Sequence, residues 1–318
     1  MSPRIEDSVK ELPDGGWAVG SMGLYKYARD EAPTPGALVC WTVGENDVYA
    51  LYDQKSPCSQ ASAVAETHRI HLAGTSAATW RLGQIIIKVK AWQKDMELEA
   101  DTIALVISKC PSVPVPQVLY NWVDTEWNRS FLIMKAIAGK DLNKMWPLLD
   151  HKGHTAIAET IAGYCKELAR QKSDEIKSGT GRGVMEHFLS PEIPDDEPSW
   201  KPYLLGPQLP EPLQRHLKEQ PKMDYSFAHC DLGPTNIIIS EDGSQVNGVI
   251  DWESAGYYPD FWIATKPCVS AAFLLEGVGS TNTQDWRGCL TTALEKSGFQ
   301  CDKRRFEAWQ RACRVKEQ

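Results

Sequence analysis

Three polar side chains in the last third of the chain could together hold a metal ion and activate a hydroxyl group. The segment FAHCDLGPTNIII, residues 227–239, places Asp231 and Asn236 five residues apart in a turn-forming run, and Asp251 follows the next apolar run. A carboxylate that faces a hydroxyl can orient it and accept its proton. Asparagine and carboxylate oxygens are ligands that magnesium prefers. Because two carboxylates converging on one point would repel, a divalent cation bridging phosphate oxygens is expected, which favours phosphoryl transfer.

The elements that precede these residues predict a small antiparallel sheet. HRIHLAG, AATWRLG and QIIIKVKAW are strand-like runs separated by turns at Gly74 and Gly83, as in a meander. A helix is expected over DMELEADTIALVISKC, where Met96 and later apolar residues fall near helical spacing. SFLIMKAIAGKDL should be a further strand that ends in a glycine turn.

The remainder of the chain is mostly helical in pattern. TAIAETIAGYCKELARQK gathers apolar residues on one face, and the sequence from TQDWRGCLTTALEK onward is also typical of helix. These patterns predict an α+β fold with a sheet-rich N-lobe and a larger helical C-lobe. The expected parts are an N-terminal extension of unknown role, the N-lobe and the C-lobe, over residues 1–55, 56–138 and 139–318.

Composition and charge exclude some classes of function. The 318 residues are 42% apolar and 24% charged, as in an ordinary globular protein. A net charge of −8 argues against a nucleic-acid-binding surface. The nine cysteines are scattered without a CxxC pair, so free thiols are expected and not a zinc site or a disulfide framework. We expect a cytoplasmic protein, because neither a membrane-length apolar run nor a signal-peptide pattern is visible.

The spacing H-x-D-x-x-x-x-N followed by I-D matches the catalytic loop and metal-binding aspartate of protein kinases. HCDLGPTNI and DWE, however, stand where protein kinases carry H-R-D-L-x-x-x-N and D-F-G. The fuller stretch HCDLGPTNIII…GVIDWESAGYYPDFWIATK resembles the aminoglycoside phosphotransferase and choline kinase family, in particular its fungal members. The signature covers about residues 227–266, and a weaker resemblance covers about residues 67–275. The resemblance implies a bilobal protein-kinase-like fold with ATP and Mg²⁺ as cofactors.

This resemblance gives each polar residue of the signature a role. Asp231 would be the catalytic base. Asn236 and Asp251 would hold magnesium. His229 would brace the loop as a hydrogen-bonded core histidine, and Glu253 would either touch metal or substrate or form a surface ion pair.

On the nucleotide side, the family needs a lysine on the third strand and a glutamate on the following helix. Lys88 and Lys90 in IIIKVK share one strand face, because they are one strand period apart. Lys88 directly follows the apolar run and would contact the α- and β-phosphates, whereas Lys90 should lie where the strand ends and solvent begins. Glu99 in EADTIAL resembles the E-A-x-x-L helix of the family and would be the partner, with Glu97 as the fallback. A solvated helix face is the alternative interpretation of these charges.

The adenine side of the site is expected on the strand that connects the lobes. FLIMKAIAG resembles the hinge strand, so Met134 would line the back of the adenine pocket. The backbone from Lys135 to Ile137 would meet the adenine edge. A plain core strand would explain the same apolar residues of FLIMKAIAG. Ile238 and Ile250 would form the pocket floor or flank the metal site.

One departure from the kinase pattern concerns the glycine-rich loop, G-x-G-x-x-G, which is absent. LAGTSAATW has the single glycine Gly74, followed by Thr75 and Ser76. Backbone amides and the Ser76 hydroxyl could still hold phosphate. Because of this departure, the phosphate donor could be another nucleotide, such as GTP, in place of ATP.

The phosphate acceptor should lie between the catalytic loop and the variable helical part. PEIPDDEPSW carries Asp195, Asp196 and Glu197, which could bind a cationic amine or form a solvated charge run. An aromatic cluster follows the metal motif and could box a quaternary amine or pack in the core. Its members are Tyr257, Tyr258, Phe261 and Trp262. The substrate therefore stays open.

We interpret the chain as a magnesium-dependent phosphotransferase that moves the γ-phosphate of ATP to a hydroxyl of a small molecule. Two rivals are a nucleotide-binding pseudokinase without turnover, which the intact motif argues against, and a nucleotidyl transferase that moves AMP. A protein kinase is disfavoured, because no A-P-E segment follows Asp251 and ESAGYYPDFW leaves little room for an activation loop. No nucleic-acid or membrane partner is expected, and the oligomeric state stays open.

Overall fold

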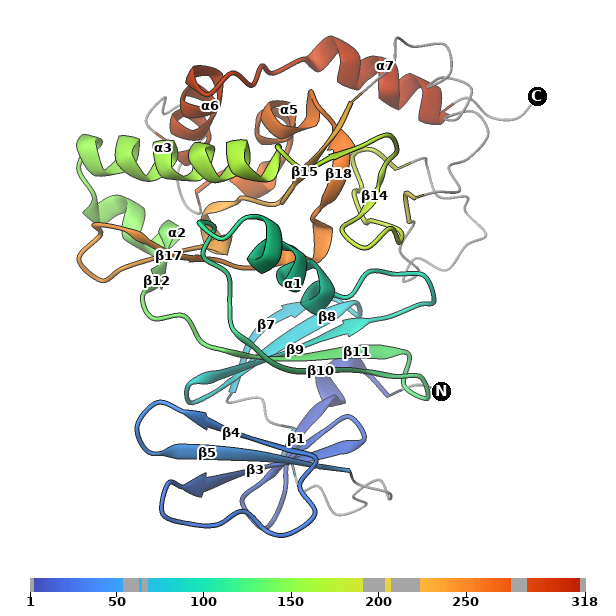
Figure 1. Cartoon of the computed structure of the whole chain (residues 1–318), viewed down its shortest axis with the longest axis vertical. Helices are drawn as coiled ribbons and strands as arrows, with labels where there is room; N and C mark the ends of the chain where they lie inside the picture. The colour runs from blue at the N-terminus through green and yellow to red at the C-terminus, as the bar shows by residue number, and fades with distance from the viewer. Residues whose placement is uncertain are drawn as a thin grey trace. The chain divides into compact units, whose positions relative to one another are not determined.

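The computed structural model forms two compact units, and each unit is built from two separate stretches of the chain. The described residues are 3–53, 63–64, 68–190, 204–206, 224–275 and 285–314. The first unit comprises Met1–Lys94 and Gln117–Ala136, and the second comprises Asp95–Pro116 and Ile137–Gln318. Figure 1 colours the chain by residue number, so that the first unit is mainly blue and cyan.

Two antiparallel sheets make up the first unit (Figure 1). A short 3₁₀-helix, η1 (Ile5–Asp7), precedes them. The first sheet has the order β4-β5-β3-β2-β1-β6, with β1 (Val9–Glu11), β2 (Trp17–Val19), β3 (Met22–Ala28), β4 (Val39–Val43), β5 (Asp47–Asp53) and β6 (Ala63–Val64). The second has the order β10-β11-β9-β8-β7, with β7 (Arg69–Ala73), β8 (Ala77–Leu82), β9 (Ile85–Ala91), β10 (Val118–Asp124) and β11 (Arg129–Lys135). The predicted meander is confirmed as β7, β8 and β9, and the apolar run ALVCWTV contains β4.

A shared core packs the two sheets of the first unit against each other. Trp80, Ile87 and Phe131 of the second sheet and Leu24 and Leu51 of the first belong to one buried cluster. In β9 burial alternates strictly, so every second side chain enters this core and the others face away from it. The N-terminal strands, whose role the sequence left open, therefore cover one face of the β7–β11 sheet.

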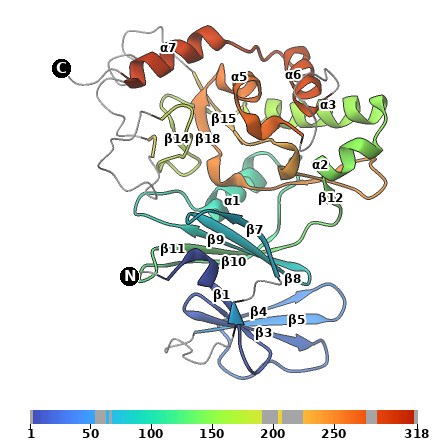
Figure 2. The same cartoon turned by 180° about the vertical axis from the view of Figure 1, so that it is seen from behind.

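Helices and two small sheets form the second unit (Figure 1 and Figure 2). The helices are α1 (Glu99–Lys109), α2 (Leu142–Met145), α3 (His151–Leu168), α5 (Trp262–Val269), α6 (Trp286–Lys296) and α7 (Lys303–Arg314). The 3₁₀-helices are η3 (Trp146–Leu148), η4 (Pro234–Asn236), η5 (Trp252–Ser254) and η6 (Ala271–Phe273). One sheet orders β12 (Lys140–Asp141), β16 (Ile237–Ile239) and β17 (Val246–Val249), and the other orders β13 (Lys172–Ser173), β15 (Tyr225–Ala228), β18 (Gly256–Pro259) and β14 (Lys177–Ser178).

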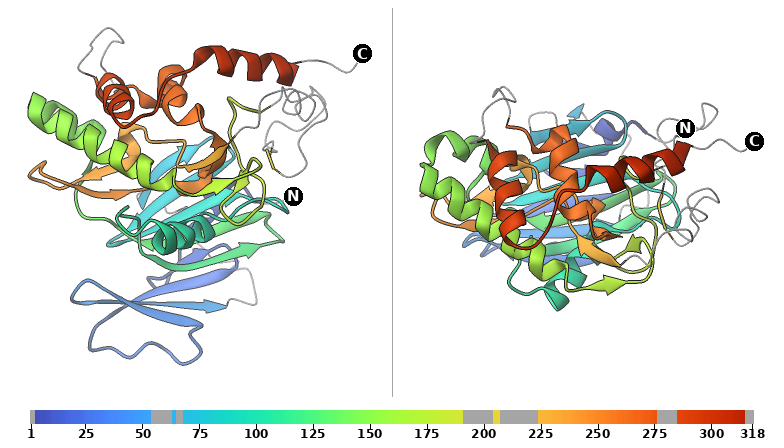
Figure 3. Two further views of the ribbon diagram at one scale, coloured as in Figure 1. Left: turned by 45° about the horizontal axis from the view of Figure 1, so that its top comes forward. Right: turned by 90° about the horizontal axis from the view of Figure 1, so that it is seen from above.

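Capping side chains set the start of α3 and α6. Asp150 accepts a hydrogen bond from the Gly153 amide at the start of α3, and Asp285 does the same for Gly288 in α6. The apolar face of α3 then packs on α6 (Figure 3). The predicted start of α1 was too early, because Met96 lies before the helix in a bridge to Gly183 and Leu98 is still extended.

The described part of the chain contains no helix that is both long and apolar enough to cross a membrane. Each of the eight cysteines within the described ranges is a free thiol, and three of them, Cys110, Cys165 and Cys230, are buried in the second unit.

Candidate active site

The hairpin of β16 and β17 places the predicted metal and floor residues on one face. Ile237 is fully buried, whereas Ile238 is partly exposed. Asn236, which ends η4 directly before β16, is also partly exposed, so it and Ile238 lie on either side of the buried Ile237. Ile250 lies opposite Asn236, and its amide donates to the Asn236 carbonyl at 2.9 Å. The hairpin therefore brings Asn236, Ile238 and Ile250 together, while the alternate residues fill the core.

Asn236 fixes the carboxylate of the predicted catalytic base. Its amide nitrogen Nδ2 donates to Asp231 Oδ2 at 2.9 Å and to the Asp231 carbonyl at 2.8 Å. Both bonds use the amide nitrogen, so the amide oxygen Oδ1 is the atom that can bind a cation. One side chain can thus orient Asp231 and still serve as an oxygen ligand.

His229 ties the catalytic loop to the segment that carries Asp251. The Asp231 amide donates to His229 Nδ1 at 3.1 Å, so Nδ1 is unprotonated and Nε2 carries the hydrogen. Nε2 lies 3.0 Å from the Ile250 carbonyl oxygen and donates to it. The ring is 1% exposed and packs edge-on against Trp252, with centroids 4.5 Å apart. These contacts are those expected of the predicted loop brace.

Two residues of this segment hold a left-handed backbone. Cys230 has φ 64° and Asp251 has φ 67°, values that cost a non-glycine residue about 1 kcal/mol or more. At Asp251 this conformation ends the extended run after β17, and η5 begins at the next residue. Trp252 anchors the turn, since it is fully buried and its Nε1 donates to the Val249 carbonyl at 2.8 Å.

Three carboxylates of the second unit converge beside this turn. One oxygen from each of Glu99, Asp251 and Glu253 lies within 4.8 Å of the others. Glu99 opens α1, and its Oε1 accepts the Trp252 amide hydrogen at 3.0 Å. This set of carboxylate oxygens has the donor chemistry that suits Mg²⁺, and the amide oxygen of Asn236 is a ligand of the same class. The structure thus places Glu99 against the segment of the predicted metal ligand.

The surroundings of Asp231 raise the pKa of its carboxyl group toward neutral pH. Burial raises the pKa of Asp231 to about 6, and the negative charges of Asp251 and Glu186 add to the increase. The positive charge of Lys266 and the hydrogen bond from Asn236 oppose it. At neutral pH the group is a carboxylate. Its pKa lies nearer to neutral pH than the pKa of an exposed aspartate does, and an effective general base has a pKa near the working pH.

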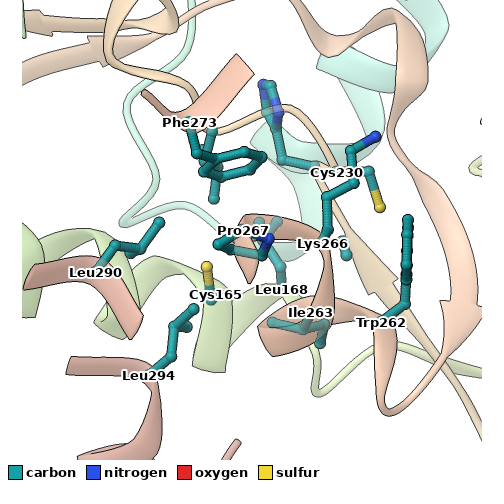
Figure 4. Close-up of a pocket in the computed structure, with 13 residues that line it drawn as sticks. Cys165, Leu168, Cys230, Trp262, Ile263, Lys266, Pro267, Phe273, Leu290 and Leu294 are labelled. Carbon is teal, nitrogen blue, oxygen red and sulfur yellow. The ribbon is translucent and has the colours of Figure 1, made fainter. Parts of the chain in front are cut away.

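A buried ion pair lies behind the catalytic loop, and it was not predicted from the sequence. Lys266 Nζ is 2.5 Å from Glu186 Oε2, with side chains 10% and 1% exposed. Trp262 Nε1 donates to the same carboxylate at 3.3 Å, and Phe188 lies 5.0 Å below the ammonium. Figure 4 shows Lys266 and Cys230 among the residues that line a small cavity here. Eighty positions separate the two charges, so no local spacing links them.

The aromatic cluster after the metal motif belongs mainly to the core. Tyr258 and Trp262 are fully buried, and Phe261 is 4% exposed. Tyr257 is partly exposed and packs on Phe227. The core-packing alternative therefore accounts for the buried members. The acidic residues proposed for acceptor binding, Asp195, Asp196 and Glu197, lie outside the described residues.

In the first unit, Lys88 and Lys90 share the face of β9 that points away from the core, as predicted. Lys88 lies between Thr79 of β8 and Leu132 of β11. The expectation that Lys90 reaches solvent was wrong, because its Nζ is buried. The reason is that β9 continues through Ala91, so strands still flank Lys90 on both sides.

In the predicted hinge strand, two backbone amides already donate hydrogen bonds within the first unit. Met134 is buried. The Lys135 amide donates to the Gln117 carbonyl at 2.9 Å, and the Ala136 amide donates to the Gln84 carbonyl at 2.8 Å. Because these two amides already donate hydrogen bonds, the predicted adenine contacts would use the other backbone groups of residues 135–137.

Ser76 and Ile137, two further residues predicted for the site, lie in a turn and against a glycine. Ser76 is exposed, and its hydroxyl donates to the Ala73 carbonyl at 2.9 Å in the turn that contains Gly74. In the second unit, Ile137 packs so closely over Gly248 that a Cβ there would lie 2.2 Å from Ile137 Cδ1. Glycine at 248 therefore leaves room for Ile137 on the face that carries Ile238.

Glu97, the fallback to Glu99, has a different structural position. Its buried carboxylate accepts hydrogen bonds from the Ser178 hydroxyl at 2.8 Å and from the Thr180 hydroxyl at 2.6 Å. The Thr180 amide adds a third bond at 3.2 Å. Glu97 therefore ties the start of α1 to residues 178–180, and Glu99 is the better candidate for the site.

Comparison with known families decides the classification. The model of the APH family, described as the phosphotransferase enzyme family, matches residues 68–273. The chain belongs to this family. The match to the phosphotransferase enzyme family includes β7–β11, α1, the catalytic loop and Asp251, whereas β1–β6, α6 and α7 lie outside it. No curated protein is significantly similar to the chain.

Solved structures similar to this family member include several aminoglycoside phosphotransferases. APH(3'')-Id from Streptomyces rimosus ATCC10970 is 16% identical, with a TM-score of 0.47, over 77% of this chain and 92% of its own. Aminoglycoside-3'-phosphotransferase of type VIII is 16% identical, with a TM-score of 0.45, over 76% and 89%. A streptomycin-ATP complex of APH(2")-IIa is 16% identical, with a TM-score of 0.44, over 77% and 80%. These likenesses assign no substrate to this chain.

Proposed function

We propose that this chain is a magnesium-dependent kinase that transfers the γ-phosphate of ATP to a hydroxyl group of a small molecule. Asp231 would act as the general base. Asn236 and Asp251 would hold Mg²⁺, and the carboxylates of Glu99 and Glu253 would complete its surroundings. Membership of the phosphotransferase enzyme family supports this reaction class.

The mechanism follows from what the side chains of the loop can do. Asp231 orients the acceptor hydroxyl and takes its proton as the hydroxyl oxygen bonds to the γ-phosphorus and the bond from that phosphorus to the β–γ bridging oxygen breaks. Asn236 and His229 hold the base in place through the Asp231 side chain and amide. Magnesium, when bound, neutralises charge on the phosphate oxygens. The products are the phosphorylated acceptor and ADP.

On the nucleotide side we propose the residues that the family resemblance indicates. Lys88 would contact the α- and β-phosphates, with Glu99 as its partner. Ser76 would help to hold phosphate. Met134, the backbone groups of residues 135–137 that remain available, Ile238 and Ile250 would surround the adenine. A cytoplasmic location and ATP in preference to GTP are part of the same proposal.

The observation that carries the proposal is the bond from Asn236 Nδ2 to Asp231 Oδ2, at 2.9 Å. It couples a base that can reach an acceptor with an amide whose oxygen can reach a cation. Nucleotide binding alone would not require a carboxylate held in this way.

The decisive experiment offers the protein ATP, Mg²⁺ and a panel of small-molecule alcohols, with product masses measured. A kinase adds a phosphate to one acceptor. The two rivals predict other outcomes, because a nucleotidyl transferase adds AMP and a pseudokinase gives no product. Nucleotide binding without any mass gain across the panel would contradict the proposal.

A further inference from the structure

A glycine-rich loop of the second unit, SGTGRG at residues 178–183, is closed by its own hydrogen bonds. Ser178 ends β14, which pairs with β18. The Ser178 amide donates to the Arg182 carbonyl at 2.8 Å, and the Arg182 amide donates to the Ser178 hydroxyl at 2.7 Å. Because β18 begins at Gly256, soon after Asp251, the loop is attached to the strand that follows the predicted metal ligand.

Glu97 joins this loop to α1 through both oxygens of its buried carboxylate. Its Oε2 accepts hydrogen bonds from the Ser178 hydroxyl at 2.8 Å and from the Thr180 hydroxyl at 2.6 Å. Its Oε1 accepts the Thr180 amide hydrogen at 3.2 Å and a hydrogen bond from the Thr102 hydroxyl of α1 at 3.4 Å. Because burying a carboxylate is costly without hydrogen-bond donors, these bonds favour one arrangement of the loop on the helix.

Backbone contacts hold the loop against the same end of α1. The Gly183 amide donates to the Asp95 carbonyl at 3.1 Å, and Met96 pairs with Gly183 in a parallel bridge. The loop also approaches the helix closely at Gly179, where a Cβ would lie 2.8 Å from Leu105 Cδ2. The loop therefore contacts both the residues that lead into α1 and the side of the helix.

The start of α1 has no capping side chain at its N-cap. Leu98 occupies that position and makes no side-chain hydrogen bond, whereas α3 and α6 each begin with a capping aspartate. Without a cap, the first amides of a helix lack a partner and its first turn is less stable. The bonds of Glu97, one residue before the N-cap, hold this turn from outside the helix.

Glu99 is the first residue of this turn, so the direction of its side chain depends on how the turn is held. Its Oε1 accepts the Trp252 amide hydrogen at 3.0 Å. One of its oxygens also belongs to the group formed with Asp251 and Glu253, whose oxygens lie within 4.8 Å of one another. Of two glutamates two residues apart, Glu97 is thus bonded to the loop and Glu99 to the turn that follows Asp251.

We infer that Glu97 is a positioning residue: with residues 178–183 it fixes the first turn of α1 and thereby holds Glu99 at residues 251–253. Glu97 supplies no ligand itself, because both of its oxygens accept hydrogen bonds from the loop and the helix. Its effect on magnesium binding passes through Glu99, and this part of the inference rests on the proposed function. The geometric part, in which Glu97 maintains the bond from the Trp252 amide to Glu99, does not.

The first test measures hydrogen exchange of the Trp252 amide by NMR, without nucleotide or metal. Thr180→Val removes one bond to Glu97 at an exposed position, so the variant should fold. We expect the Trp252 amide to exchange about 10-fold faster, because the turn loses a hydrogen bond to a charged group. Thr180→Ser keeps the hydroxyl and should restore the wild-type rate. Thr160→Val is the matched control, since it removes an exposed hydroxyl that donates to the Ala156 carbonyl in α3.

The second test asks whether the effect passes through Glu99. ATP is titrated calorimetrically, with and without Mg²⁺, into wild type, Thr180→Val, Glu99→Ala and the double variant. Thr180→Val should lower the magnesium-dependent gain in affinity about 3-fold or more by itself, and should have no further effect when Glu99 is already alanine.

The inference is overturned if Thr180→Val causes the same loss of affinity with and without Glu99, as a purely structural role would. It is also overturned if the Trp252 amide exchanges at the wild-type rate in Thr180→Val, or equally fast in Thr160→Val. A wild type without any magnesium-dependent gain would contradict the proposed function instead, and the exchange rates would then decide the inference by themselves.

Discussion

The catalytic loop of the second unit and the β9 strand of the first unit position their charged groups by different means. In the loop, named side-chain bonds fix the groups, as in the bond from Asn236 to Asp231 and the bonds of His229. In β9, register alone fixes Lys88 and Lys90 on one face. Hydrogen bonds in the loop thus assign one atom to each role, whereas the strand face offers two lysines for one role.

Asp231→Asn removes the proposed base from the catalytic loop and should have the largest effect on turnover. Asparagine keeps the shape and can still accept the Asn236 bond, but it cannot take a proton. We expect kcat to fall about 10²-fold or more, with ATP affinity nearly unchanged. Steady-state kinetics with the acceptor found in the product screen measures the loss. Asp242→Asn, an exposed turn position, is the control, and a rate for Asp231→Asn within a few-fold of it would remove Asp231 from the mechanism.

The β9 strand is tested by Lys88→Ala. Loss of its charge should lower kcat/KM for ATP about 10²-fold, equivalent to about 2.7 kcal/mol of transition-state stabilisation. Lys90→Ala should instead lower the melting temperature, because its buried Nζ is part of the packed strand. Kinetics and thermal melts of both variants decide between them, and a larger kinetic loss in Lys90→Ala would reassign the phosphate lysine.

His229→Gln weakens the link between the two halves of the loop. The variant leaves at least one buried partner of the ring unsatisfied, which should cost about 1–3 kcal/mol of stability. The kcat should fall as well, with the KM for ATP little changed, because Asp231 loses its support. Thermal melts and kinetics should separate it from His154→Gln, which removes a bond to the Trp146 carbonyl elsewhere. Equal kcat in the two variants would limit His229 to a structural role.

The pH dependence of stability gives a smaller test of the Asp231 environment. Its folded pKa, about 6, lies above the usual value of 3.8, so its ionisation destabilises the fold. The stability that the protonated group contributes is complete below about pH 4 and is lost as pH rises through 6. Without magnesium, Asp231→Asn should therefore be more stable than wild type above pH 6, by about 3 kcal/mol in the free energy of unfolding, and equally stable near pH 4. A difference independent of pH would contradict the raised pKa.

The sequence predicted the catalytic segment in greater detail than its surroundings. Strand alternation sufficed to predict the face that Lys88 and Lys90 share, whereas the roles of Asn236 and Ile238 came from the family resemblance and stay predictions. The burial of Lys90 Nζ was missed, because strand length depends on pairing with β8 and β11 and not on local residue types. The pair of Glu186 and Lys266 was also missed, because tertiary packing alone brings the two charges together.

The same limit applied to residues 1–55. Their strands were recognisable only in part, and nothing in their composition indicated that Leu24 and Leu51 would share a core with Trp80 and Phe131. Sheet-on-sheet packing depends on faces formed by segments far apart in the sequence. Such a partnership leaves no local motif.

The central claim is that Asn236 and Asp251 form the magnesium-dependent part of a nucleotide site. Calorimetric titration of ATP, with and without Mg²⁺, tests it without an acceptor. Wild type and Asp242→Ala should bind ATP more tightly with Mg²⁺, whereas Asp251→Ala and Asn236→Ala should lose that magnesium-dependent gain. An undiminished gain in Asp251→Ala, in a variant that melts like a folded protein, would place the metal site elsewhere and contradict the account.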